Sequence, residues 1–181
     1  MMRAFIAIDV EMNDEMEKVY EMLEATEAKL KFVSPSNVHL TLKFLGEIDE
    51  AIIPKIKKIM EEAVQDIEPF KAKIKGMGVF PSLKNIRVIW LGFHDEGQAV
   101  KITRNIDERI SSLGFKKEKE HKPHVTIARM KSGYRKEQII KIVEENRTKE
   151  FGEIYCESIK LKQSILKPEG PIYKTVEEIK L

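Results

Sequence analysis

The stretch HLTLKFLG at residues 39–46 and the stretch HVTIARMK at residues 124–131 share one pattern. In each, aliphatic residues alternate with a histidine and then a threonine, which is typical of a strand with one buried face. Side chains two residues apart on a strand point the same way, so each strand presents an imidazole beside a hydroxyl. The four residues concerned are His39, Thr41, His124 and Thr126.

The two stretches are separated by close to half of the 181 residues. Each is preceded by a helical pattern and a polar turn, and each is followed by another helical pattern. We therefore expect an internal duplication that gives two pseudo-symmetric lobes. The two His-x-Thr strands are expected to face each other across a central cleft.

The rest of the pattern predicts an α+β fold. Amphipathic runs predict helices near 14–31, 49–65, 97–113 and within 132–146. Alternating or continuous apolar runs predict strands near 3–10, 38–46, 70–80, 86–93, 124–130, 151–166 and 172–181. Several connections are hairpin-like, which favours mostly antiparallel sheet with the helices packed outside. No linker composition divides the chain, so residues 1–181 are expected to form a single bilobal domain.

Composition narrows the class of protein. Hydrophobic residues make up 42% of the chain and charged residues 34%, which is typical of a globular protein. The formal net charge of +2 does not by itself indicate a nucleic-acid partner, so any basic surface is local. Cys156 is the only cysteine, which excludes an internal disulfide and a cysteine-based zinc site.

The sequence contains no secretory signal. It also contains no apolar run as long as the ~20 residues that span a membrane. We therefore expect a cytoplasmic protein without membrane contact. A monomer is expected, because nothing in the sequence indicates an obligate interface. Many Lys, Glu and Ile residues with few Asn and Gln are typical of a thermophile.

The paired motifs indicate phosphate chemistry. An imidazole titrates near neutrality, so one histidine can accept a proton while the other donates one. Threonine hydroxyls can donate hydrogen bonds to the non-bridging oxygens of a phosphate held between them. A single histidine on a strand face is usually structural. Here, two of only four histidines occupy matching contexts, which favours a site.

Longer segments around the motifs resemble a known family, the two-histidine (2H) phosphoesterases, and within it the RNA 2′,3′-cyclic phosphodiesterases, also called 2′-5′ RNA ligases. The resemblance covers nearly the whole chain. It rests on RAFIAIDV at 3–10, NVHLTLKFLGE at 37–47, GVFPSLKNIRVIWLGF at 78–93, HKPHVTIARMK at 121–131 and LKPEGPIYKTV at 166–176.

The resemblance implies a bilobal fold with both motifs lining a central cleft. It also implies hydrolysis of RNA 2′,3′-cyclic phosphate ends to 2′-phosphates, without a metal or another cofactor. The partner would be such an RNA end or a small cyclic nucleotide. Carried over to this chain, His124 would be the base that activates water and His39 the acid, while Thr41 and Thr126 hold the phosphate. Run in reverse, the same site would join RNA ends through a 2′-5′ linkage.

Three further residues are candidates for substrate binding: Arg129, Lys43 and Phe5. Arg129 matches the basic position of the family, and a guanidinium suits phosphate geometry. It lies five residues after His124, so an unbroken strand would turn it away, and only a bulge would bring it to the phosphate. Lys43 is expected to share the strand face of Thr41 and to attract RNA phosphate, although a solvated lysine fits the pattern equally well.

An RNA-end enzyme is also expected to stack a base on an aromatic ring. The family suggests Phe5, although its strand looks buried, and Phe80, Trp90 and Tyr134 are open alternatives. Two other functions remain open at this point. One is a non-catalytic module that binds RNA ends or nucleotides, and the other is a metal hydrolase that uses His121 and His124. The sequence otherwise indicates no metal site, and His94 is expected in a surface turn.

Overall fold

The computed structural model describes residues 1–181 in full. Its four α-helices are α1 (Asp14–Ala25), α2 (Ile53–Ala63), α3 (Gln98–Ile110) and α4 (Lys136–Glu145). Its nine strands are β1 (Met2–Asp9), β2 (Leu30–Phe32), β3 (His39–Ile48), β4 (Phe70–Ser82), β5 (Asn85–His94), β6 (His124–Met130), β7 (Glu150–Cys156), β8 (Ser158–Lys167) and β9 (Gly170–Lys180).

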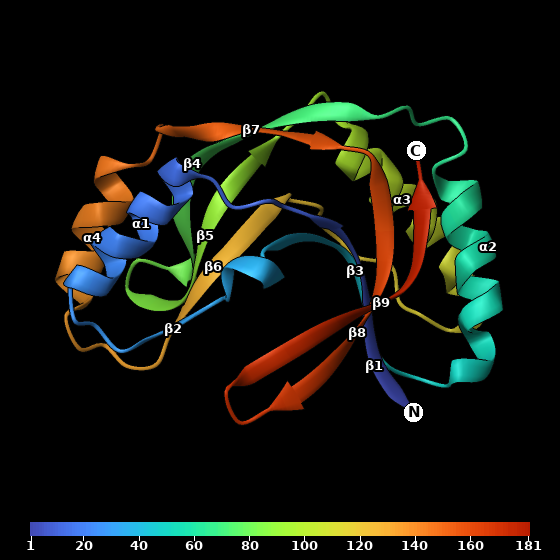
Figure 1. Cartoon of the computed structure of the whole chain (residues 1–181), viewed down its shortest axis with the longest axis horizontal. Helices are drawn as coiled ribbons and strands as arrows, with labels where there is room; N and C mark the ends of the chain where they lie inside the picture. Colours follow the sequence, from blue (N-terminus) through green and yellow to red (C-terminus); the bar gives the residue numbers. More distant parts are fainter.

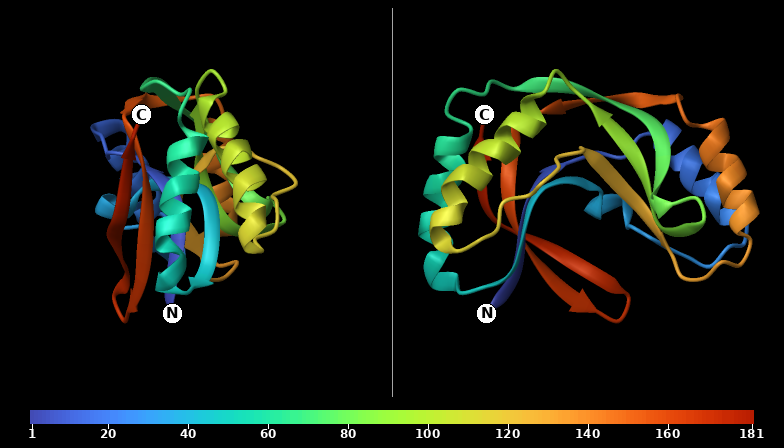
Figure 2. Two further views of the ribbon diagram at one scale, coloured as in Figure 1. Left: turned by 90° about the vertical axis from the view of Figure 1, so that its right-hand side faces the viewer. Right: turned by 180° about the vertical axis from the view of Figure 1, so that it is seen from behind.

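All nine strands belong to one sheet, and every pair of neighbours is antiparallel. The order is β7-β4-β5-β6-β3-β1-β8-β9, with β2 paired to β6 outside this path. The sheet curls strongly, and the β8–β9 hairpin projects from it below the centre of the molecule (Figure 1). The view from behind shows the same arched shape (Figure 2).

The strand order is near-symmetric about the contact between β6 and β3, which carry the two motifs. Moving outward, β5 corresponds to β1, β4 to β8 and β7 to β9. Helices α1 and α4 pack on the half that holds β4 to β7, and α2 and α3 pack on the other half (Figure 1). The predicted fold class of two similar halves of antiparallel sheet with outer helices is therefore confirmed.

Two element boundaries differ from the sequence prediction. Helix α1 begins where the Asn13 side chain accepts the backbone N–H of Met16 at 2.9 Å, and it ends at Ala25 instead of residue 31. The chain cannot continue as a helix because Glu27 has a φ of 58°. The residues that follow, Leu30–Phe32, form a strand that pairs with β6. The strand expected at 151–166 is divided at Glu157 into β7 and β8, which lie in different halves of the sheet.

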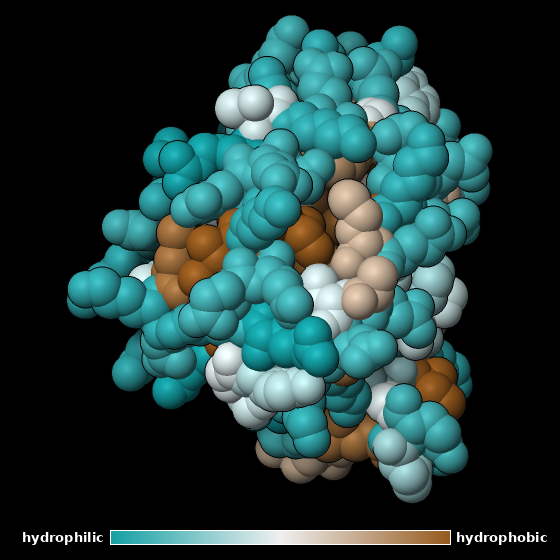
Figure 3. All heavy atoms as spheres, turned by 90° about the vertical axis from the view of Figure 1, so that its left-hand side faces the viewer, coloured by the Kyte–Doolittle hydropathy of each residue, from teal (hydrophilic) through white to brown (hydrophobic).

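One apolar cluster of 43 buried residues fills the space between the sheet and the helices. The helices contribute one face each, as with Ile56 and Met60 of α2 and Ile102 and Ile106 of α3, all fully buried. The outer face of the half that carries α1 and α4 is hydrophilic over most of its area, with a few apolar patches (Figure 3). None of the helices combines the length and the apolar character needed to cross a bilayer.

Candidate active site

The two motif strands are direct neighbours. Leu40 of β3 lies opposite Val125 of β6 in an antiparallel pair. Because the two strands run in opposite directions, this register places His39 opposite Thr126 and His124 opposite Thr41. The expectation that the motifs face each other across a groove is therefore wrong, since they lie side by side on one sheet surface. His39 and His124 are therefore diagonal neighbours, whose backbone positions on such a pair are about 7–8 Å apart.

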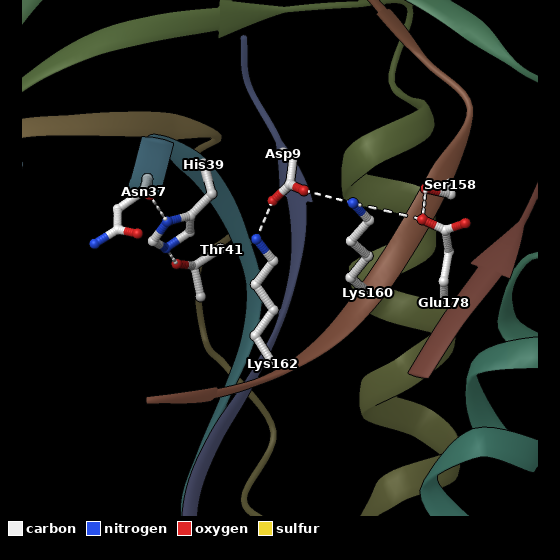
Figure 4. A network of polar contacts seen from close by, with 8 residues as sticks. All are labelled: Asp9, Asn37, His39, Thr41, Ser158, Lys160, Lys162 and Glu178. Atoms are coloured by element: carbon white, nitrogen blue, oxygen red, sulfur yellow. Dashed lines mark hydrogen bonds and ion pairs between the residues drawn. The ribbon is translucent and has the colours of Figure 1, made fainter. Parts of the chain in front are cut away.

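Both imidazoles are oriented in the same way. The Nδ1 atom of His39 lies 2.7 Å from the carbonyl oxygen of Asn37, and Nδ1 of His124 lies 2.9 Å from that of Lys122. A carbonyl only accepts hydrogen bonds, so each Nδ1 carries a proton and each neutral ring keeps its lone pair on Nε2. In His39 that Nε2 lies 3.0 Å from the Thr41 hydroxyl (Figure 4). Both rings are therefore positioned for proton transfer through Nε2.

The environments of the two rings differ. The His39 ring packs against Phe5 at a centroid distance of 4.9 Å and against Tyr173 at 5.4 Å. The His124 ring packs edge-on against Phe80 at 4.9 Å, with Trp90 at 6.3 Å. Phe5 is only 4% exposed, so its ring supports His39 and leaves little area for a stacked base.

A cluster of charges lies beside His39 (Figure 4). Asp9, at the end of β1, pairs with Lys160 at 2.7 Å and with the largely buried Lys162. Burial raises the pKa of the Asp9 carboxyl, but hydrogen bonds from the two lysines outweigh it and leave that pKa lowered. Burial is the largest of the effects that lower the pKa of His39. The hydrogen bond to Asn37 and the charge of Asp9 oppose this shift, and the charges of Lys162 and His124 add to it. Near-neutral pH therefore favours the uncharged form of His39.

Arg129 is brought to the site by a bulge in β6. Trp90 of β5 pairs with Thr126 and Ile89 with Ala128, so Ile127 is an extra residue in β6. Ile127 and Ala128 are both buried, and the exposed Arg129 returns to the face of Thr126. This is the strand irregularity that the sequence required for Arg129 to reach a phosphate.

An equivalent bulge in β3 has the opposite consequence for Lys43. Thr41 pairs with Ala7 and Lys43 with Ile6, so Leu42 is the extra residue. The expectation that Lys43 shares the face of Thr41 is therefore wrong, and Phe44 occupies that face instead. Lys43 is 2% exposed.

The Lys43 ammonium forms a buried ion network on the other side of the strand. Its Nζ lies 2.8 Å from Asp107 Oδ1 and 3.5 Å from Glu118, and it also donates to the carbonyl of Lys116. These contacts join α3 and the connector before β6 to the first motif strand. The Lys43 ammonium is thus held in a structural ion network. Lys43 does not line the cavity that holds Arg129, although it does line the cavity that holds His124.

The motif residues line two adjoining cavities. The first, of about 380 Å³, contains the Thr41 and Thr126 side chains together with His39, Phe5 and Arg129. The second, of about 300 Å³, contains His124, and Thr41 lines both. The tip of the β8–β9 hairpin forms one wall of the first cavity. It is held there by the Asn37 side chain, which donates to the Pro171 carbonyl at 2.9 Å.

Sequence reasoning missed most of the other residues that line the first cavity, among them Arg3, Asn37 and Tyr173. Arg3 could have been found, because it is two residues before Phe5 and shares its strand face. Tyr173 could not, since its contact with His39 depends on how the C-terminal hairpin folds back. Tyr134, another aromatic candidate, is exposed and lies outside this cavity.

His121 and His94 lie outside the motif pair. His121 Nε2 is 3.6 Å from Asp107 Oδ2, and His94 Nε2 is 3.1 Å from the Lys75 carbonyl. No group of three or more His, Cys, Asp or Glu side chains is arranged to hold a metal ion. The ligand set that a His121 and His124 metal hydrolase would need is thus not assembled.

Comparisons with known proteins identify the family of the chain. A profile of the family described as LigT like Phosphoesterase matches residues 6–90 and 93–173. A Methanocaldococcus jannaschii protein named RNA 2′,3′-cyclic phosphodiesterase is 42% identical over 179 residues, covering 98% of this chain and 99% of that protein. A protein of the same name from Methanothermobacter thermautotrophicus is 33% identical over 181 residues, with 99% and 98% covered.

Solved structures have the same fold. The crystal structure of TT0787 of Thermus thermophilus superposes with a TM-score of 0.74 at 28% identity, covering 99% of this chain and 98% of that one. Escherichia coli LigT in apo form gives a TM-score of 0.69 at 21% identity, with 99% and 97% covered. The chain therefore belongs to the LigT-like phosphoesterase family.

Proposed function

We propose that this phosphoesterase hydrolyses 2′,3′-cyclic phosphate ends of RNA to 2′-phosphates by general acid–base catalysis, without a metal ion. The observation that carries the proposal is the Leu40–Val125 register, which sets two imidazoles and two hydroxyls side by side on one sheet surface, along two adjoining cavities that share Thr41. The names of the relatives support the substrate class, because those at 33% and 42% identity are called RNA 2′,3′-cyclic phosphodiesterases.

In the proposed reaction a water molecule attacks phosphorus, and its oxygen forms the new P–O bond. One imidazole Nε2 takes the proton of that water. The bond from phosphorus to the ribose 3′ oxygen breaks, and the other histidine, in its protonated imidazolium form, gives the proton on its Nε2 to that oxygen. The product carries a 2′-phosphate and a free 3′-hydroxyl. The Thr41 and Thr126 hydroxyls and the Arg129 guanidinium would stabilise the charge that builds up on the non-bridging oxygens.

The order of the two histidines can be argued from their surroundings. The near-two-fold geometry gives both rings the same kind of Nδ1 hydrogen bond, so these bonds alone support either order. The sequence suggested His124 as base and His39 as acid. Because the pKa of His39 is lowered by burial and by Lys162, its neutral form is favoured, and only the neutral form accepts a proton. We therefore propose the opposite order, with His39 as base and His124 as acid.

The same site supports the ligation chemistry. If a ribose 5′-hydroxyl takes the place of water, the 5′ oxygen attacks the cyclic phosphate, the 3′ oxygen leaves, and a 2′-5′ linkage forms. Water is far more abundant than RNA ends, so hydrolysis is the proposed main reaction.

The proposal is tested with a short RNA that ends in a 2′,3′-cyclic phosphate, incubated with the protein in EDTA. We expect multiple turnovers and a product with a 2′-phosphate, identified by ³¹P NMR. Tight binding without turnover would instead indicate a non-catalytic RNA-end module. Activity that EDTA abolishes and that Zn²⁺ or Mn²⁺ restores would indicate a metal hydrolase.

A further inference from the structure

A third cavity continues from the candidate active site. It has a volume of about 240 Å³ and lies between the β4–β5 turn, the end of β6 and the start of α4. Lys131 lines both this cavity and the first cavity of the site, so the two are contiguous. The lining of this third cavity is Lys84, Asn85, Ile86, Arg87, Met130, Lys131, Ser132, Gly133 and Lys136. Four of these residues are basic and none is acidic.

A bulge in β5 turns Arg87 toward the third cavity. Val88 pairs with Phe80 and Ile86 with Pro81, which makes Arg87 an extra residue in β5. Ile86 and Ile89 are buried on the core side, while Arg87 is exposed and Val88 is half-buried. Since Val88 lies opposite Arg129 in the pairing of β5 with β6, Arg87 and Arg129 belong to the same face.

The basic side chains along this path lack acidic partners. None of Lys84, Arg87, Lys131 and Lys136 forms an ion pair, and the same holds for Arg3, Lys31 and Arg129 of the first cavity. Nearby cations do pair, as Arg135 with Glu27 and Lys141 with Glu145. Lys136 Nζ donates only to the Lys84 carbonyl, at 3.1 Å. The path therefore keeps its positive charge although the whole chain has a net charge of only +2.

We propose that Lys84, Arg87, Lys131 and Lys136, here called the basic track, bind the phosphates of an RNA strand that extends from the active site. This inference rests on the proposed function. A 2′,3′-cyclic phosphate is by its chemistry the 3′ end of a strand, so every remaining nucleotide lies on its 5′ side. The basic track consequently receives phosphates upstream of the reacting nucleotide, and an oligonucleotide is a better substrate than a cyclic mononucleotide.

The test compares kcat/KM for a cyclic mononucleotide with that for oligoribonucleotides of two to eight nucleotides that carry the same cyclic end. The track variant is Lys84→Gln/Arg87→Gln/Lys136→Gln, which leaves Lys131 of the first cavity intact. The matched control is Lys55→Gln/Lys58→Gln/Arg104→Gln, which removes three exposed cations from α2 and α3. Circular dichroism shows whether each variant is folded, and Arg87→Gln alone replaces the triple variant if it is not.

For the wild type we expect kcat/KM to rise about tenfold from the mononucleotide to the longer strands. The track variant should lose that rise and keep its mononucleotide activity, whereas the control variant should keep both. Single-strand affinity falls with salt at a slope of about 0.7 per phosphate contact, so the track variant should lower the slope by about 2. No dependence on length in the wild type, or an equal loss in the control variant, would overturn the proposal.

Failure of the proposed function gives a different result. In that case neither substrate is hydrolysed by the wild type. The basic track is then tested by the fluorescence anisotropy of a labelled oligoribonucleotide, with the same salt titration. A slope that is the same for the wild type and the track variant rejects the track, whatever the catalytic result.

Discussion

Leu40 lies directly opposite Val125 in the antiparallel pairing of β3 with β6, and this pair marks the centre of the near-two-fold arrangement. Its consequence is that the histidine of each strand lies opposite the threonine of the other. Neither half of the molecule contains a complete set of catalytic groups, so the candidate site depends on this single register.

Replacing either motif histidine should remove most of the activity. For His39→Ala and for His124→Ala we expect kcat to fall about 10²-fold or more, because each removes a general acid or base. The measurement is turnover of a cyclic-phosphate RNA in EDTA. His94→Ala is the matched control, since His94 lies outside both cavities of the site. Wild-type turnover in both motif variants would falsify the paired-histidine mechanism.

The pH dependence should report the lowered pKa of His39. As a base it must be neutral, so kcat/KM should fall as the pH drops through a pKa below the ordinary 6.5. Lys162→Gln removes one cause of the shift and should move this acid limb to higher pH. Lys160→Gln is the control, because Lys160 pairs with Asp9 without being among the groups that shift His39. An acid limb at or above 6.5 in the wild type would argue for His39 as the acid.

Arg129 should matter for phosphate binding. Arg129→Gln removes a charge-assisted hydrogen bond worth about 1.5–3 kcal/mol, so kcat/KM should fall roughly 10- to 150-fold. Arg129→Lys should recover only part of the loss, since an ammonium does not bind a phosphate in a bidentate manner. The same change at exposed Arg104 on α3 provides the control. Equal rates for Arg129→Gln and wild type would show that this guanidinium does not reach the phosphate.

Lys43 should contribute to stability and not to RNA affinity. Lys43→Met leaves the buried Asp107 carboxylate without its closest cation, which costs about 3–5 kcal/mol. For a chain of this size the midpoint of thermal unfolding should fall by about 6–20 °C. Lys58→Met, at an exposed position of α2, should change it little.

A second variant separates the ion pair from simple loss of packing. In Lys43→Met/Asp107→Leu both charges are gone, so part of the lost stability should return. If Lys43 bound RNA as the sequence suggested, Lys43→Met would instead weaken substrate binding at an unchanged unfolding midpoint.

The sequence by itself determined the class of fold and the pairing of a histidine with a threonine in each motif strand. The strand period of two places His39 beside Thr41 and His124 beside Thr126, whatever surrounds them, because that spacing is a local property of an extended backbone. The amphipathic runs likewise determined four helices on the outside of antiparallel strands. These features depend on residues close together in the chain, so they can be predicted from one sequence.

Only the tertiary structure decided how the motifs meet and which nearby side chains join them. The extra residues at Leu42 and Ile127 invert the local period, turning Lys43 into the interior and Arg129 toward the cavity that holds Thr41 and Thr126. A bulge is defined by the partner strand, so no local pattern indicates it. The same reason applies to Tyr173, which reaches His39 only because a distant hairpin folds back over the site.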